Sequence, residues 1–311
     1  MMPDKDSPKS SADKLARSFT PPFKYRIGQA IAWVFRFKVV SIANSLFSKA
    51  QSPTYITRNL FGFQFVCDIT RSITHQALFL NGERSIEERY LVSSLVDESA
   101  HAVDIGANIG YYLLMLEKEV GQNGKVTLIE PSIENLPELK LNIELNHFTN
   151  VDLHEVAIGM ENGAIGLKTG VNSGIVESDQ GAYQVRLKTL DSIVEEKVDF
   201  LKIDVEGYEG QVLGGAEALI ERDHPTIFLE MHPHMLERFG FTTRGIIQKL
   251  ESKYEDMVFY ELHRPENKNV LKKIFSRYSK TDPMQVILDA GSFVDKCDSG
   301  LINRPFWVVC R

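Results

Sequence analysis

From residue 101 onward, short apolar runs alternate with longer amphipathic segments. Short apolar runs between turn residues predict buried strands, and the longer segments predict helices. We expect strands at 101–105, 125–130, 151–156, 199–204, 226–231, 257–262 and 306–310. We expect helices at 85–96, 109–120, 132–145, 209–221 and 242–253. This alternation predicts an α/β fold, in which helices cover both faces of a mostly parallel sheet.

Two regions depart from the alternation. Residues 157–190 are rich in glycine and hairpin-like, which indicates an insertion rather than a crossover helix. Residues 55–68 alternate in places, through Phe61, Phe63 and Phe65, and predict a strand or hairpin that leads into the main domain.

The N-terminal region has a composition of its own. Residues 1–22 are rich in Ser, Lys, Asp and Pro, so we expect a disordered lead without a secretory signal. Residues 23–47 carry four basic and no acidic side chains amid regularly spaced apolar ones, which predicts an amphipathic basic helix. It either contacts an anionic membrane or an acceptor, or packs on the main domain. We divide the chain into an N-terminal extension, 1–80, and a main domain, 81–311.

Charge and cysteine content narrow the function classes. The net charge of -7 over 311 residues argues against nucleic-acid binding, which needs a concentrated basic face. Three widely spaced cysteines suggest free thiols in a reducing compartment. Arg36 and Lys38 interrupt the apolar N-terminal run, so a membrane span is not expected. We expect a cytoplasmic protein with, at most, peripheral membrane contact through residues 23–47.

A glycine turn follows the strand expected at 101–105. Gly106 permits a tight turn, and we expect Gly110 to let the backbone approach a ligand closely. An NAD site wants a third glycine between these two, where the chain has Asn108, and Asp104 would repel a pyrophosphate. A cationic ligand without phosphates fits better. S-adenosylmethionine carries an ammonium group that Asp104 can attract, directly or through water.

The next two strand ends add to this cofactor site. Glu130 and Pro131 end the second strand, and Glu130 is placed to accept hydrogen bonds from two ribose hydroxyls. Backbone groups of Val156 and Ala157 are expected at the adenine edge. Each acid or glycine alone has an ordinary structural explanation as a cap or packing residue. Acids and glycines at the ends of consecutive strands favour a binding site.

Four longer motifs resemble those of a known family. They are Asp104-Ile-Gly-Ala-Asn-Ile-Gly110, Glu130-Pro131, Thr189-Leu-Asp191 and Asp199-Phe-Leu-Lys-Ile-Asp-Val-Glu-Gly-Tyr-Glu209. Together they closely resemble the FkbM family of S-adenosylmethionine-dependent methyltransferases, over about residues 85 to 262. The resemblance implies a class I methyltransferase fold of seven strands with an antiparallel last strand. It also implies O-methylation of a hydroxyl on a sugar, glycan or secondary metabolite.

Acidic residues and a histidine follow the fourth and fifth strands. We expect a general base, or groups that orient the acceptor, among Asp204, Glu206, Glu230 and His232. His232 has an ordinary pKa suited to taking a proton at neutral pH. Alternatively, Asp204 and Glu230 hold a divalent cation. Lys202 either faces the other side of the sheet or is paired.

Two other function classes stay open. A methyltransferase-fold protein without catalysis would bind a partner and use its N-terminal segment for localisation. A nicotinamide-dependent oxidoreductase is disfavoured by the missing middle glycine. Cofactor binding and turnover separate these classes.

Overall fold

A computed structural model describes most of the chain. The described residues are 55–68, 70–71, 75, 78, 86–169, 175–176, 182–262 and 284–311. The predictions for residues 1–22 and 23–47 lie outside the described residues. The boundary at residues 80 and 81 stays a prediction.

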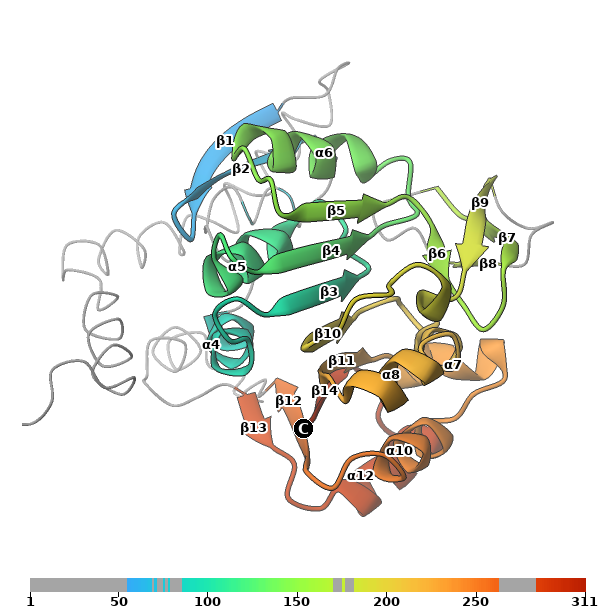
Figure 1. Ribbon diagram of the computed structural model, residues 1–311. Helices are drawn as coiled ribbons and strands as arrows, with labels where there is room; N and C mark the ends of the chain where they lie inside the picture. The colour runs from blue at the N-terminus through green and yellow to red at the C-terminus, as the bar shows by residue number, and fades with distance from the viewer. Residues whose placement is uncertain are drawn as a thin grey trace, which may run out of the picture.

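A central sheet of eight strands organises the fold (Figure 1). In spatial order its strands are β13 (Met284–Val286), β12 (Met257–Leu262), β14 (Phe306–Cys310), β11 (Thr226–Met231), β10 (Phe200–Ile203), β3 (His101–Ile105), β4 (Lys125–Ile129) and β5 (Val151–His154). From β5 to β11 all neighbours are parallel. The strand β14 runs antiparallel to both β11 and β12, and β13 is antiparallel to β12.

This sheet confirms the predicted fold class. All seven expected strands are present, and the last one, β14, is antiparallel. The order of these seven is that of a class I methyltransferase. The edge strand β13 was not predicted, because its three residues form too short a run to stand out in the sequence.

Two layers of helices bury the sheet. The first layer holds α4 (Ile86–Leu95), α5 (Tyr111–Val120) and α6 (Leu136–Leu145). The second holds α7 (Glu209–Gly214), α8 (Glu217–Asp223), α9 (Pro233–Leu236), α10 (Thr243–Glu251) and α12 (Ala290–Asp298). Short 3-10 turns lie at η1 (Leu190–Ser192) and η2 (Glu237–Phe239). Alternate residues of a strand face opposite layers: Ala102 packs in the first, whereas Val103 and Ile105 pack in the second.

One predicted helix is broken in two. The sequence predicted a single helix over 209–221, but α7 ends at Gly214 and α8 begins at Glu217. At Gly215 the backbone passes so close to the carbonyl oxygen of Gly159 that a Cβ would lie 1.9 Å from it. The Asp191 carboxylate accepts hydrogen bonds from the backbone amides of the first turn of α8. A cap at this point fixes the start of a second helix.

Two smaller β units flank the sheet. The region 157–190 forms β6 (Ala157–Ile158), β7 (Gly163–Leu167), β8 (Ile175–Val176) and β9 (Tyr183–Lys188) in the order β6-β9-β7-β8. This unit lies at the end toward which β3, β4 and β5 point (Figure 1). The strands β1 (Tyr55–Leu60) and β2 (Phe63–Asp68) form an antiparallel hairpin beside α6.

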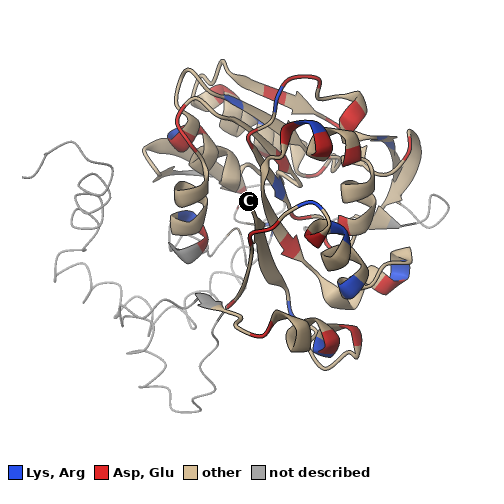
Figure 2. Ribbon diagram, turned by 60° about the horizontal axis from the view of Figure 1, so that its bottom comes forward, with Lys and Arg blue, Asp and Glu red and all other residues tan. Residues whose placement is uncertain are grey.

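Three further findings concern the charged residues, the cysteines and the lengths of the helices. Figure 2 shows that acidic and basic residues are interspersed along the ribbon of the described residues. The cysteines Cys67, Cys297 and Cys310 are buried and free. Within the ranges given above, no helix has the length and apolar content needed to cross a membrane.

Candidate functional site

A cavity of about 290 Å³ opens at the carboxyl ends of β3, β4 and β10. Open parallel sheets bind ligands at this edge. Its lining comes from the glycine turn, the ends of β4 and β10, the start of the insertion and the segment after β2. The lining residues are His75, Leu78, Ile105, Gly106, Ala107, Asn108, Ile109, Tyr111, Tyr112, Ile129, Glu130, Pro131, Asn135, Val156, Ala157, Ile158, Ile175, Asp204, Val205 and Glu206.

The glycine turn is shaped by two left-handed residues. Gly106 has a φ of +85°, and a Cβ there would lie 1.9 Å from the carbonyl oxygen of Asp204. Asn108 adopts a φ of 51°, and its Oδ1 accepts a hydrogen bond from the amide of Ile109. Asn tolerates this conformation better than most residues. Both residues line the cavity, and their predicted contact with the cofactor stays a prediction.

Gly110 lies close to α6. Its φ is +89°, and a Cβ there would lie 2.9 Å from Cδ1 of Leu139 in α6. Gly110 is the N-cap of α5 and is not among the cavity-lining residues that the structure describes. The close approach that the structure shows is to α6, and the approach of Gly110 to a ligand stays a prediction.

Glu130 is the most completely held acid of the cavity. Its Oε1 accepts from the amide of Ser132 at 2.9 Å and from Nδ2 of Asn135 at 3.1 Å. Its Oε2 accepts from the amide of Asn108 at 2.7 Å. Burial raises the pKa of Glu130, although these hydrogen bonds oppose the shift. A carboxylate oxygen has two lone pairs, so Oε2 keeps one acceptor position.

Asp104 lies behind the turn rather than on the cavity wall. Its side chain faces the first helix layer, directly across from Lys202 on β10, and Lys202 Nζ donates to Oδ1 at 2.8 Å. Asp104 is fully buried and Lys202 nearly so. Lys202 Nζ also lies 4.5 Å from the ring centroid of Tyr112. Although burial lowers the pKa of Lys202, the charges of Asp104 and other nearby acids raise it above its ordinary value.

This pairing changes the prediction for two residues. A direct contact between Asp104 and a cofactor ammonium does not fit, because Lys202 already holds the carboxylate in a closed layer. Lys202 is paired, one of the two alternatives that the sequence left open. The other three predicted cofactor residues, Pro131, Val156 and Ala157, line the cavity.

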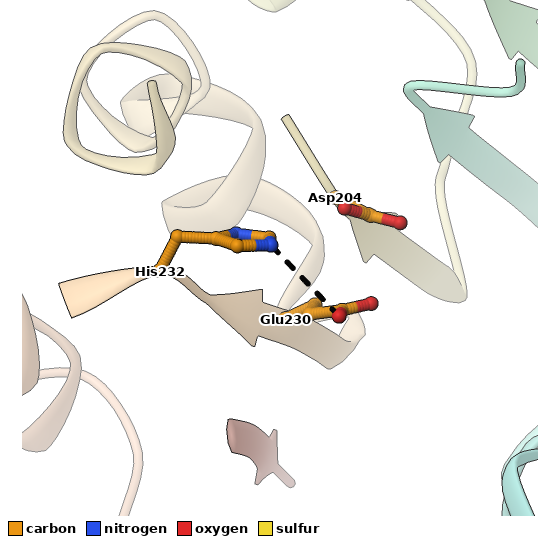
Figure 3. Close-up of side chains that lie close together, drawn as sticks. All are labelled: Asp204, Glu230 and His232. Atoms are coloured by element: carbon orange, nitrogen blue, oxygen red, sulfur yellow. Dashed lines mark ion pairs between the residues drawn. The ribbon is translucent and has the colours of Figure 1, made fainter. Parts of the chain in front are cut away.

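The predicted catalytic residues divide into two groups. Asp204 and Glu206 follow β10 and line the cavity. Glu230 is the next-to-last residue of β11, and His232 follows the strand; both are buried, and neither is among the lining residues described. Figure 3 shows Asp204, Glu230 and His232 facing one another from adjacent strand ends. Glu206 has a φ of 52°, a conformation that non-glycine residues seldom adopt outside special sites.

His232 is held by an acid that the sequence did not single out. Its Nδ1 donates to Oε1 of Glu209 at 2.7 Å, and its Nε2 lies 3.9 Å from Oε1 of Glu230 and 3.8 Å from Oε2 of Glu206. Burial lowers the pKa of His232, but the hydrogen bond and charge of Glu209 outweigh it, with help from Asp204 and Glu230. The result is a pKa of about 9. The imidazole is therefore charged at neutral pH and is a poor proton acceptor there, contrary to the sequence-based argument from its ordinary pKa.

Three of these side chains also have the spacing of a cation site. Ligand atoms of Asp204, Glu230 and His232 all lie within 4.8 Å of one another. The two carboxylates suit a hard divalent cation, whereas a protonated imidazole does not, because a metal has to displace its proton. The two carboxylates can therefore bind a divalent cation as they stand, whereas His232 can bind one only after it loses a proton.

Sequence reasoning missed several cavity residues. Asn135 precedes α6 and holds Glu130, and its position five residues after that acid is a usable clue. Tyr111 and Tyr112 directly follow the glycine turn. His75 and Leu78 reach the cavity from a distant part of the chain, and no local pattern marks them.

The chain is similar to known methyltransferases. A model of the methyltransferase FkbM domain matches residues 104–259, which is half of the chain. Methyltransferase 1 of Beauveria bassiana (strain ARSEF 2860) is 26% identical over 168 residues, which cover 45% of this chain and 67% of that protein.

Solved structures also resemble the fold. The methyltransferase FkbM from Methylobacillus flagellatus KT is 22% identical with a TM-score of 0.45, over 62% of this chain and 52% of that one. The chain thus spans about half the length of that protein. TYW2 from M. jannaschii, in complex with AdoMet, is 15% identical with a TM-score of 0.45, over 84% of this chain and 87% of that one. The sequence match, and not these scores, identifies the family.

Proposed function

The chain belongs to the FkbM family of methyltransferases, and we propose that it moves a methyl group from S-adenosylmethionine to a hydroxyl oxygen of a sugar, glycan or secondary metabolite. In that reaction the acceptor oxygen bonds to the methyl carbon as the carbon–sulfur bond breaks. The sulfonium becomes the thioether of S-adenosylhomocysteine, and the hydroxyl proton leaves to a base. The protein must seat the cofactor and place a base beside the methyl group.

The observation that carries the proposal is the geometry of Glu130. Three donors fix its carboxylate at the cavity wall, and Oε2 accepts only one of these hydrogen bonds, which leaves it an acceptor position for a ribose hydroxyl. A fixed carboxylate binds a diol well because its orientation costs nothing on binding. A hydrogen bond to a charged acceptor contributes about 1.5–3 kcal/mol. The apolar wall from Val156 to Ile158 then takes the adenine.

Asp204 is the base that the geometry favours. It directly follows β10, the strand next to β3, lines the cavity and is only partly buried. Glu230 and His232 lie behind it and shape its surroundings. Orientation of the acceptor supplies up to about 7–11 kcal/mol in favourable cases, and a general base typically adds 10²–10⁴-fold. Glu206 lines the same end and is the candidate for orienting the acceptor.

A cation held by Asp204 and Glu230 is the second candidate for this end of the cavity, because their oxygens lie close enough to share one. Bound there, a divalent cation would lower the pKa of an acceptor hydroxyl. Dialysis against EDTA separates the two candidates. If Asp204 acts as the base, turnover survives dialysis; turnover that is lost and then restored by Mg²⁺ or Mn²⁺ supports the cation.

Calorimetry with the full chain tests the cofactor. S-adenosylhomocysteine should bind with a stoichiometry near one, and NAD⁺ should not compete. Failure of the folded protein to bind S-adenosylhomocysteine contradicts the proposal. Binding without methyl transfer to any hydroxyl acceptor favours the alternative of an inactive binding protein.

The N-terminal segment bears on the acceptor. We propose that residues 23–47, with four basic and no acidic side chains, contact an anionic lipid surface or a lipid-linked glycan. Co-sedimentation with phosphatidylglycerol vesicles compares the full chain with a chain lacking residues 1–50. Equal soluble fractions for the two chains rule out the membrane contact.

A further inference from the structure

The β1–β2 hairpin precedes the residues that match the family model, but it is hydrogen-bonded to α6, beside the cavity. The match begins at residue 104, whereas β2 ends at Asp68. Further along the chain than the hairpin, His75 and Leu78 line the cavity. A part of the chain that the family model does not cover therefore helps to form the cofactor site.

Side chains along one face of α6 bind the free edge of β2. Residues spaced four apart along the helix form hydrogen bonds with every second residue of the strand. The hydrogen bonds join Glu138 to the amide of Asp68 at 2.7 Å, Asn142 to both backbone groups of Val66 at 2.7 and 3.0 Å, and Asn146 to both backbone groups of Gln64 at 2.7 Å. Four helical residues rise about 6 Å and two strand residues about 6.6 Å, so the two periods nearly match.

The turn after β2 aims an arginine at α6. Oδ1 of Asp68 accepts from the amide and the hydroxyl of Thr70, and the amide of Arg71 donates to the carbonyl of Asp68. The Arg71 guanidinium then donates to Oε1 of Glu138 at 2.8 Å and to Oδ1 of Asn135 at 2.6 Å. Its side chain is mostly buried.

This contact sets the orientation of the Asn135 amide. Arginine only donates, so it holds Oδ1 of Asn135 on its own side. The NH₂ group of Asn135 is thereby turned toward Glu130, where it donates to Oε1 at 3.1 Å. Without Arg71 only the hydrogen bond to Glu130 orients the amide, and the oxygen of Asn135 loses the donor that holds it in place. The hydrogen bonds form a relay from Arg71 through Asn135 to Glu130.

We propose that Arg71 is a positioning residue for the cofactor, which fixes Glu130 through Asn135 so that Oε2 is presented to the ribose hydroxyls. The inference rests on the proposed function, since it takes S-adenosylmethionine as the ligand of the cavity. It makes the segment after β2 a working part of the cofactor site rather than an extension.

Titration of S-adenosylhomocysteine into full-length variants tests the relay. R71M should weaken binding about tenfold, and N135A should do the same. The double variant R71M/N135A should bind no more weakly than N135A alone, because residues in one relay are not additive. The matched control is K140M. Lys140 is an exposed basic residue of α6 that pairs with Glu155, and its loss should leave the affinity for S-adenosylhomocysteine unchanged.

Each other outcome has a definite meaning. If the wild type binds and R71M binds within twofold of it, the relay is wrong. Additive losses in the double variant, or an equal loss in K140M, also overturn it. N135A keeps the contact of Arg71 with Glu138, so wild-type affinity in N135A overturns the relay even if R71M unfolds. If the wild type itself fails to bind S-adenosylhomocysteine, the proposed function fails instead.

Discussion

Glu130 and Glu230 are two buried acids at strand ends of one sheet, and their surroundings differ. Glu130 is 4% exposed and accepts three hydrogen bonds, two of them from backbone amides. Glu230 is 5% exposed and faces a charged imidazole across 3.9 Å, within a cluster of acids. Backbone donors fix a carboxylate for one ligand, whereas a cluster of side chains can exchange protons and partners. The first arrangement suits cofactor binding, and the second suits chemistry on an acceptor.

The largest expected effect is on methyl transfer alone, from a substitution at Asp204. D204N should lower kcat by about 10²–10⁴-fold, because it removes the carboxylate that takes the acceptor proton. E155Q removes an exposed acid beside the end of β5 and serves as the control, with kcat unchanged. Methyl transfer measured at saturating cofactor checks both variants. A D204N enzyme with wild-type kcat would remove Asp204 from the mechanism.

The next effect is on stability and concerns the buried ion pair between Asp104 and Lys202. K202M leaves Asp104 charged and buried without its partner, which typically costs about 3–5 kcal/mol of unfolding free energy. K197M removes a pair between exposed groups, Lys197 and Asp199, and such pairs contribute at most about 1 kcal/mol. Urea unfolding of the two variants measures the difference. Equal stabilities would show that the buried pair does not hold the centre of the sheet.

A smaller effect comes from an acid outside both ends. Burial raises the pKa of Glu117, on α5, to about 7, although a hydrogen bond with Asn150 opposes the shift. The unfolded value is about 4.3, so the folded state binds the proton more tightly, and stability falls as the pH rises from about 4.5 through 7. E117Q should remove roughly 2 kcal/mol of that fall.

Thermal unfolding at pH 5 and pH 8 measures this effect. The Tm of the wild type should drop more than that of E117Q between the two values. E119Q, which changes a neighbouring acid on the same helix that accepts from Ser93, should follow the wild type. A parallel decline in all three proteins would contradict the assignment to Glu117.

The sequence predicts most of the sheet and part of the site. The seven predicted strands appear because buried parallel strands are continuous apolar runs, and Glu130 follows one of them. The pairing of Asp104 with Lys202 was not predicted, although the alternation of side chains along the strand was available. Asp104 lies one residue before Ile105 at the strand end, and adjacent residues face opposite layers.

Other features depend on contacts that a sequence pattern does not contain. The fit of β2 on α6 joins residues that lie 70 to 82 positions apart, so neither partner reveals the other. The pKa of His232 depends on Glu209, the first residue of α7, which lies 23 positions earlier in the chain. The break between α7 and α8 follows from the approach of Gly159 to Gly215, which only the folded insertion creates.

One measurement tests most directly whether Glu130 binds the cofactor while Asp204 acts in methyl transfer. S-adenosylhomocysteine is titrated into the wild type, E130Q and D204N in parallel. The account predicts that E130Q loses at least about tenfold in affinity, because a neutral amide binds the ribose diol poorly, while D204N stays within about threefold of the wild type. Equal affinities for E130Q and the wild type, or a larger loss in D204N than in E130Q, would contradict it.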